Sequence, residues 1–226
     1  MRRKSPMRAA LKTTILTLSF ATLSLTANAA IITTTFSGGN QLSGNMFDAT
    51  VFANPLTVTS LTVNVADAMG ASDLEVYTKP GSYLGFETNP AAWTLVSTTS
   101  LLEATGPQVV DVTDFVLPAG AVTGIYITVN NAAAWNLSYT NGNGSNQTYT
   151  NSDLQLDLGV GKLYPFSITR NPRVWNGSIQ YNIGVAAIPE ASSVVMSGLG
   201  ITAIGALIYN RRRKETARVE KPSNEA

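Results

Sequence analysis

The 226-residue chain contains no cysteine and no histidine. The absence of cysteine excludes disulfide bonds and thiol nucleophiles, and the absence of histidine excludes a Ser-His-Asp triad. Without thiolate or imidazole ligands, the usual zinc and copper sites are excluded as well. Carboxylates and other oxygen-containing groups therefore remain as the candidate metal ligands and acid–base groups.

Charged residues are scarce, at 13% of the chain, and the cations are concentrated at its two ends. Between residues 30 and 190 there are four cations and eleven acids, which gives this span a net charge of −7. Nucleic-acid binding needs clustered Lys and Arg side chains that neutralise phosphates. The acidic middle of the chain therefore argues against a nucleic-acid partner.

The first 29 residues have the features of a secretory signal peptide. Cations up to Lys12 precede an apolar run from Thr13 to Leu25 that contains no acid. Small residues then occupy the −3 and −1 positions that signal peptidase prefers, so cleavage is predicted before Ala30. The residues of this cleavage site are Ala27, Ala29 and Ala30. The sequence therefore predicts export through the general secretory route.

A second apolar segment, Val194–Tyr209, lies near the C-terminus and contains no charged residue. As a helix it rises about 24 Å, against a hydrocarbon core of about 30 Å, so flanking residues have to help it span. Cations follow the segment, and the positive-inside rule places them in the cytoplasm: Arg211, Arg212, Arg213 and Lys214. We predict a single transmembrane helix with the body of the protein outside and residues 215–226 as a cytoplasmic tail.

A Pro-Glu pair precedes this helix, in the sequence Pro189-Glu190-Ala191. The order of Pro-Glu, small residues, a glycine-containing apolar helix and three arginines resembles the PEP-CTERM sorting signal of Gram-negative bacteria, over residues 188–214. The resemblance implies that an exosortase-type membrane protease recognises Pro189, Glu190 and Ala191 and cuts there. The third position is Ala where the family box has Pro, and twelve residues follow Lys214 where family tails usually end sooner. The apolar run and the cations alone also fit a permanent membrane anchor.

Residues 30–187 show period-2 alternation and no helical periodicity. The clearest predicted strands are Thr57–Val65, Thr123–Val129 and Asp153–Gly159, each with apolar residues on one face. Weaker alternation predicts the strands Ile31–Phe36, Met46–Ala53, Leu74–Thr78, Ser82–Glu87, Trp93–Thr99, Gln108–Val112, Trp135–Thr140 and Val174–Ile183. The pattern predicts an all-β domain, an antiparallel two-sheet sandwich with jelly-roll-like connections.

Four short segments of residues 30–187 also carry a resemblance to known sequences: Gly44–Asp48, Gly81–Glu87, Gly159–Lys162 and Pro172–Ile179. Together they resemble a β-rich module of bacterial secreted and surface proteins. Because that module has no assigned activity, the resemblance implies a surface location and no particular ligand.

Calcium is the metal that an oxygen-only ligand set suits. Acids gather near predicted turns at residues 67–75, where the candidate ligands are Asp67, Asp73 and Glu75. This segment lacks the residue order of an EF-hand loop, and acidic turns that keep a protein soluble explain the same residues. We therefore expect no cofactor, with a calcium site as the alternative.

Exposed aromatic rings are the usual platforms for sugars. Trp93 and Trp175 are expected in the core, because tryptophan carries a large apolar area. Tyr139 and Tyr149 flank the polar, glycine-rich loop 141–146, and loops on a rigid scaffold often carry binding sites. These two tyrosines are therefore the candidate sugar contacts.

These features predict a non-catalytic protein that is exported and sorted to the cell surface or extracellular matrix of a Gram-negative bacterium. Its predicted role is structural or adhesive, in exopolysaccharide or biofilm. The alternatives are a calcium-assisted carbohydrate-binding module and a permanently anchored periplasmic protein. No spacing of carboxylates selects a glycosidase-like pair. The expected partners are the exosortase-type protease, the membrane and exopolysaccharide.

Overall fold

The computed structural model describes residues 28–67, 72–131 and 136–184, and these residues form an all-β domain without an α-helix. The strands are β1 (Asn28–Thr33), β2 (Asn40–Leu42), β3 (Gly44–Val51), β4 (Leu56–Val65), β5 (Asp73–Pro80), β6 (Thr94–Ser100), β7 (Gly106–Leu117), β8 (Val122–Val129), β9 (Leu137–Asn141), β10 (Thr148–Thr150), β11 (Leu154–Lys162), β12 (Thr169–Arg170), β13 (Arg173–Trp175) and β14 (Gly177–Ile183). A short 3-10 helix, Pro90–Ala92, precedes β6.

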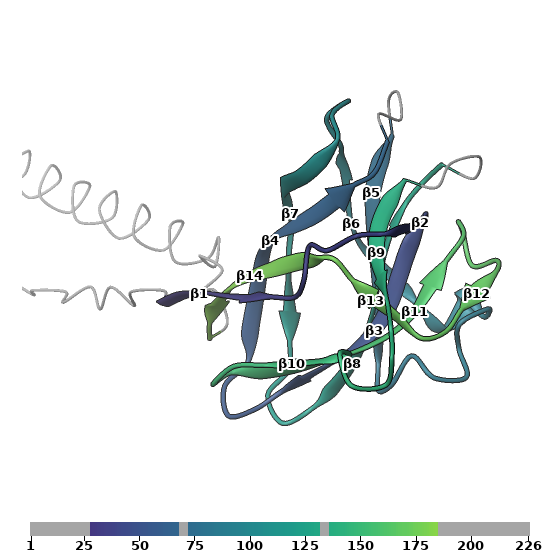
Figure 1. The fold of residues 1–226 in the computed structure, drawn as a ribbon. Helices are drawn as coiled ribbons and strands as arrows, with labels where there is room; N and C mark the ends of the chain where they lie inside the picture. The colour runs from purple at the N-terminus through teal and green to yellow at the C-terminus, as the bar shows by residue number, and fades with distance from the viewer. Residues whose placement is uncertain (1–27, 68–71, 132–135, 185–226) are drawn as a thin grey trace, which may run out of the picture.

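The strands form two antiparallel sheets (Figure 1). Sheet A has the order β1-β14-β4-β9-β13, with β7 also paired to β4 and β2 to β9. Sheet B has the order β10-β11-β3-β8-β5-β6, with β12 paired to β11. The prediction of an all-β protein with two antiparallel sheets is confirmed.

The main core lies between the two sheets and is built by alternate residues of the long strands. In β4, Leu61, Val63 and Val65 are buried while the residues between them are half-buried, as the period-2 pattern predicts. Phe47 of β3 stacks on Trp175 of β13, with ring centroids 5.2 Å apart and the planes inclined by 19°. This ring pair joins the two sheets.

Several predicted strands are wrong in extent or in kind. Ser82–Glu87 is a series of turns in place of a strand, because Gly81 and Gly85 adopt positive φ angles of 76° and 81°. The predicted strand Val174–Ile183 is divided into β13 and β14 at Asn176. The buried Asn176 side chain accepts a hydrogen bond from the Gly38 N–H and donates to the Val174 carbonyl, which fixes the break.

Other predicted strands have different bounds. β1 begins at Asn28 in place of Ile31. β7 continues to Leu117 in place of Val112, because the buried and exposed residues of β7 alternate through a bulge. The alternation did not predict β2, β10 and β12, which have two or three residues each and are too short for a periodic pattern.

The described chain enters and leaves the sandwich at the same end. Asn28 at the start of β1 pairs with Ile183 at the end of β14, and Ile183 pairs in turn with Leu56. At the opposite end, β4 finishes at Val65 and β5 begins at Asp73. We call these the terminal end and the distal end of the sandwich.

Every described strand lies between Asn28 and Ile183, so a fragment of residues 28–184 contains the whole described core. In this fragment we expect Phe47→Ala to lower the free energy of unfolding by about 3–5 kcal/mol, because a fully buried ring is removed. Leu102→Ala is the control, since Leu102 is 73% exposed and its loss is expected to change stability by less than about 0.5 kcal/mol. Urea unfolding measures both. Equal losses would contradict the position of Phe47 between the sheets.

Candidate functional site

A second apolar cluster covers the outer face of sheet B. Its buried members are Met46, Tyr83, Trp93, Tyr126 and Val160, with Tyr77, Ala92 and Phe166 packed against them. The pairing register explains the cluster, because it places Tyr77, Tyr126, Met46 and Val160 side by side on β5, β8, β3 and β11. The segments between β5 and β6 and between β11 and β12 supply the remaining rings.

The rings of this cluster are in close contact. Tyr77 stacks on Tyr126 at a centroid distance of 5.7 Å, and Phe166 meets both rings edge-on, at 5.4 Å from Tyr77 and 5.0 Å from Tyr126. Trp93 completes the group at 6.1 Å from Tyr126. Aromatic pairs of this geometry each stabilise by about 0.5–1.5 kcal/mol beyond the area they bury. The cluster is therefore a rigid platform for the groups at its rim.

Two buried lysines hold the covering loops on the sheet. The Lys79 amine donates to the carbonyl oxygens of Pro80 and Ser82, at 2.9 and 2.8 Å, and lies 4.1 Å from the centre of the Phe86 ring. The Lys162 amine donates to the Ser167 carbonyl at 2.5 Å and to the Thr169 hydroxyl at 2.7 Å. Burial lowers the pKa of Lys162 to about 8.

Asp48 on β3 fixes the start of the loop between β5 and β6. Its carboxylate accepts hydrogen bonds from the Ser82 hydroxyl at 2.6 Å and from the Tyr83 N–H at 2.8 Å. Burial raises the pKa of Asp48, and Asp157, directly opposite on β11, adds to the shift. These bonds turn the loop so that the Tyr83 ring lies over Gly159, where no side chain with a Cβ fits.

The polar rim of the platform is formed by Glu75, which is only 9% exposed, and by the half-buried Tyr77 and Tyr164, and we identify it as the candidate site. The Tyr77 hydroxyl donates to the Glu75 carboxylate at 2.7 Å. Burial and then the neighbouring Glu75 carboxylate raise the pKa of Tyr77 and of Tyr164, so both phenols stay protonated at neutral pH. Leu95, opposite Tyr77 on β6, is 48% exposed and continues the apolar surface.

A carboxylate beside aromatic rings and phenol hydroxyls has the chemistry that sugar hydroxyls recognise. The carboxylate accepts hydrogen bonds, the phenols donate and accept, and the rings give apolar contact to the C–H faces of a sugar. Glu75 pairs with Thr128, close to the distal end of sheet B. The candidate site therefore lies away from the end at which the described chain enters and leaves.

The two predicted sugar contacts lie elsewhere. Tyr139 is only 4% exposed, with the Arg173 guanidinium 5.2 Å from its ring centre, so the expectation that it is exposed is wrong. Its burial follows from its place on β9, which is paired on both sides, to β2 and to β13. Tyr149 on β10 is half-buried and packs against the main core. The structure does not bring these two rings into one exposed patch.

The predicted calcium ligands are Asp67, which is exposed, and Asp73 and Glu75 on β5. The two Asp73 oxygens accept hydrogen bonds from the Ser100 hydroxyl at 2.8 Å and the Asn130 amide at 3.1 Å. Within the described ranges no group of three acidic side chains is arranged to hold a metal ion. Glu75 alone of the three belongs to the candidate site.

The predicted processing and sorting residues are outside the described part of the chain, with two exceptions. Ala29 and Ala30 belong to β1, where Ala30 pairs with Tyr181. Ala27, Pro189, Glu190, Ala191 and the cations from Arg211 to Lys214 lie outside the described residues. Residues 28–67, 72–131 and 136–184 include no helix of the length and apolarity that a membrane span requires.

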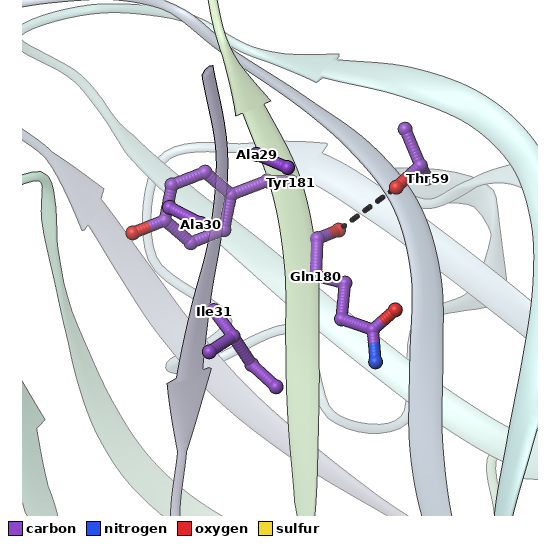
Figure 2. Close-up of a pocket in the computed structure, with 6 residues that line it drawn as sticks. All are labelled: Ala29, Ala30, Ile31, Thr59, Gln180 and Tyr181. Carbon is purple, nitrogen blue, oxygen red and sulfur yellow. Dashed lines mark hydrogen bonds between the residues drawn. The ribbon is translucent and has the colours of Figure 1, made fainter. Parts of the chain in front are cut away.

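An open hollow of about 300 Å³ lies beside β1 (Figure 2). It is lined by Ala29, Ala30 and Ile31 of β1, Thr59 of β4, and Gln180 and Tyr181 of β14. The Thr59 hydroxyl is 3.5 Å from the Gln180 carbonyl oxygen. The lining contains no charged side chain and only one ring.

Comparisons with known proteins give little further information. No protein-family model matches the sequence, and a search of curated proteins finds no match. Among solved structures, the clostridial cysteine protease Cwp84 after propeptide cleavage is similar at a TM-score of 0.44 and 15% identity. The similarity covers 69% of this chain and 40% of that one.

Alkaline titration tests the burial of Tyr83, whose pKa is raised to about 12, first by burial and then by the charges of Asp48, Glu87 and Asp157. Between about pH 10 and pH 12 the unfolded phenol loses its proton while the folded phenol keeps it, so stability falls as the pH rises. We expect Tyr83→Phe to flatten this fall by up to about 1.4 kcal/mol per pH unit. Unfolding of fragment 28–184 at pH 7, 10 and 11.5 is the measurement. An unchanged slope with unchanged stability at pH 7 would contradict the buried position.

Proposed function

We propose that this chain is an exported, non-catalytic β-sandwich protein that is sorted to the bacterial cell surface or extracellular matrix, where it has a structural or adhesive role. The supporting observation is the pairing of Ala30, the first residue after the predicted cleavage, with Tyr181 near the end of β14. Because of this pairing, the predicted signal peptide and the predicted sorting segment join the domain at the same end. The distal end, with Glu75 and Tyr77, then faces away from the membrane while the tail is attached.

The test of sorting is the intact mass and cellular location of the protein in its native host. We expect the wild-type chain to end near residue 190 and to lie outside the cytoplasmic membrane. The variant Pro189→Ala/Glu190→Ala is expected to stay at full length in the membrane, because the protease no longer recognises its box. Recovery of residues 215–226 on the wild-type protein in the inner membrane would replace sorting with permanent anchoring.

A second candidate function, carbohydrate binding, is favoured by the geometry of Glu75, Tyr77 and Tyr164. The ligand class is a neutral glycan, because the rim carries a carboxylate, and the amine of Lys162 at the end of β11 is fully buried against loop oxygens. Anionic sugars meet the Glu75 charge and are disfavoured.

Binding of neutral oligosaccharides to fragment 28–184, screened on an array and measured by titration, tests this candidate. Glu75→Gln is expected to weaken binding about tenfold or more, because a hydrogen bond to a charged group contributes about 1.5–3 kcal/mol. Asp111→Asn is the matched control, since Asp111 is an exposed carboxylate on β7 of the other sheet. Absence of binding to any neutral glycan, or an equal loss in both variants, would reject the site.

A further inference from the structure

The outer edge of β1 carries backbone groups without a strand partner among the described residues. β1 pairs only with β14, and the Thr34 N–H donates to the Gly177 carbonyl at 3.0 Å. Successive residues of a strand direct their N–H and C=O groups to opposite sides. Even-numbered residues therefore bond to β14, and Ile31 and Thr33 direct their backbone groups to the open side.

Other sheet edges are protected in ways that natural proteins commonly use. β7 carries Pro107, Asp111 and Asp114, and it lies beside β6, where the Thr113 N–H donates to the Ser97 hydroxyl at 3.0 Å. β10, β12 and β13 have only two or three residues each. In contrast, β1 has six residues with neither charge nor proline, of which Ala30, Ile31, Ile32 and Thr33 remain after the predicted cleavage, and its Ile31 side chain is 52% exposed. An edge of this kind is a template for a further strand.

The charge distribution limits where on the surface a second copy of this domain can approach. Nine of the ten acidic residues between 28 and 184 are at least partly exposed, whereas Lys79 and Lys162, two of the four cations, are buried. Two copies of this acidic domain therefore repel each other over most of their surface. Across β1, β14 and β4, the residues paired with the outward-facing positions of β1 carry no charge. These sets of paired residues are Ala29-Asn182-Thr57, Ile31-Gln180-Ser60 and Thr33-Ser178-Thr62. A second copy meets no like charge there.

We propose that β1 is a self-association edge, to which a second copy of this chain adds its own β1 in antiparallel orientation. With Ile31 opposite Thr33 of the second copy, the two residues on each copy form about four inter-strand hydrogen bonds. The pairing uses only residues that remain after the predicted cleavage before Ala30. It joins the two A sheets into one continuous sheet across a two-fold axis.

One side chain covers part of this edge in the single copy. The Asn151 amide lies 3.4 Å from the Ile31 carbonyl oxygen, and it also donates to the Tyr181 hydroxyl at 2.7 Å. A contact of 3.4 Å is at the long limit for a hydrogen bond, so the Thr33 N–H of the second copy replaces it at little cost. The Ile31 side chain lies beside the open hollow that is lined by residues of β1, β4 and β14 (Figure 2).

A charge substitution tests the association on the full-length chain in detergent, by sedimentation velocity over a range of concentrations. We expect a dimer for the wild type, and at least a tenfold higher dissociation constant for Ile31→Lys, because an edge lysine opposes strand addition. Val109→Lys is the matched control, since Val109 is a 67% exposed β-branched residue on the outer face of β7. Its dissociation constant is expected to stay within about twofold of the wild type. A wild type that remains monomeric, or equal effects of the two lysines, would overturn the proposal.

Cysteine cross-linking provides a second test that does not depend on weakening the fold. The natural sequence has no cysteine, so every disulfide reports on the introduced residues. In Ile31→Cys/Thr33→Cys, introduced together with Pro189→Ala/Glu190→Ala so that the tail is kept, we expect mild oxidation of the membranes to give a covalent dimer. Val109→Cys/Asp111→Cys has the same spacing on the outer face of β7 and is expected to remain monomeric. Equal dimer yields for the two pairs would contradict pairing through β1.

Discussion

The central strands of sheet B are buried on both faces, and the rest of the structure depends on this constraint. Inner residues of β3 such as Phe47 pack against sheet A, while Met46 on the other face packs under Trp93 and Tyr126. The outer face stays dry only if the loops that cover it are held in place. Because a loop has few regular backbone hydrogen bonds, side chains from the sheet have to supply them, and Lys79 and Lys162 do this with buried amines.

The sequence predicted strands well where one face is polar, and poorly where tertiary contacts decide. β4, β8 and β11 show alternation, and their positions were predicted to within about three residues. Ser82–Glu87 was wrong because the bonds from Ser82 and Tyr83 to Asp48, far away in the chain, give it a turn conformation. For the candidate site, the spacing of Glu75 and Tyr77 on one strand already places both on one face. Tyr164 joins them only through a loop whose path depends on Lys162.

The balance of charge in the folded domain differs from what the composition suggests. The whole chain has a formal charge of +1, yet the sandwich is acidic and half of its four cations are buried. The buried amines donate to carbonyl and hydroxyl oxygens of the loops and hold these loops in place. Their charges therefore do not neutralise the acidic side chains on the surface. A surface of one sign limits which partners approach closely, and it gives a neutral region such as the β1 edge a greater share of the available contacts.

The same topology separates the neutral β1 edge from the rim of Glu75, Tyr77 and Tyr164. The β1–β14 pairing closes the sandwich at the terminal end, whereas Glu75 lies near the start of β5 at the distal end and on the other sheet. A contact at the β1 edge therefore leaves the rim of Glu75, Tyr77 and Tyr164 uncovered on both copies. Two copies joined at β1 present two such rims, and two linked weak sites bind a repeating polymer more tightly than one site does. Under the two proposals, pairing at the β1 edge and glycan recognition at the rim reinforce each other without sharing a residue.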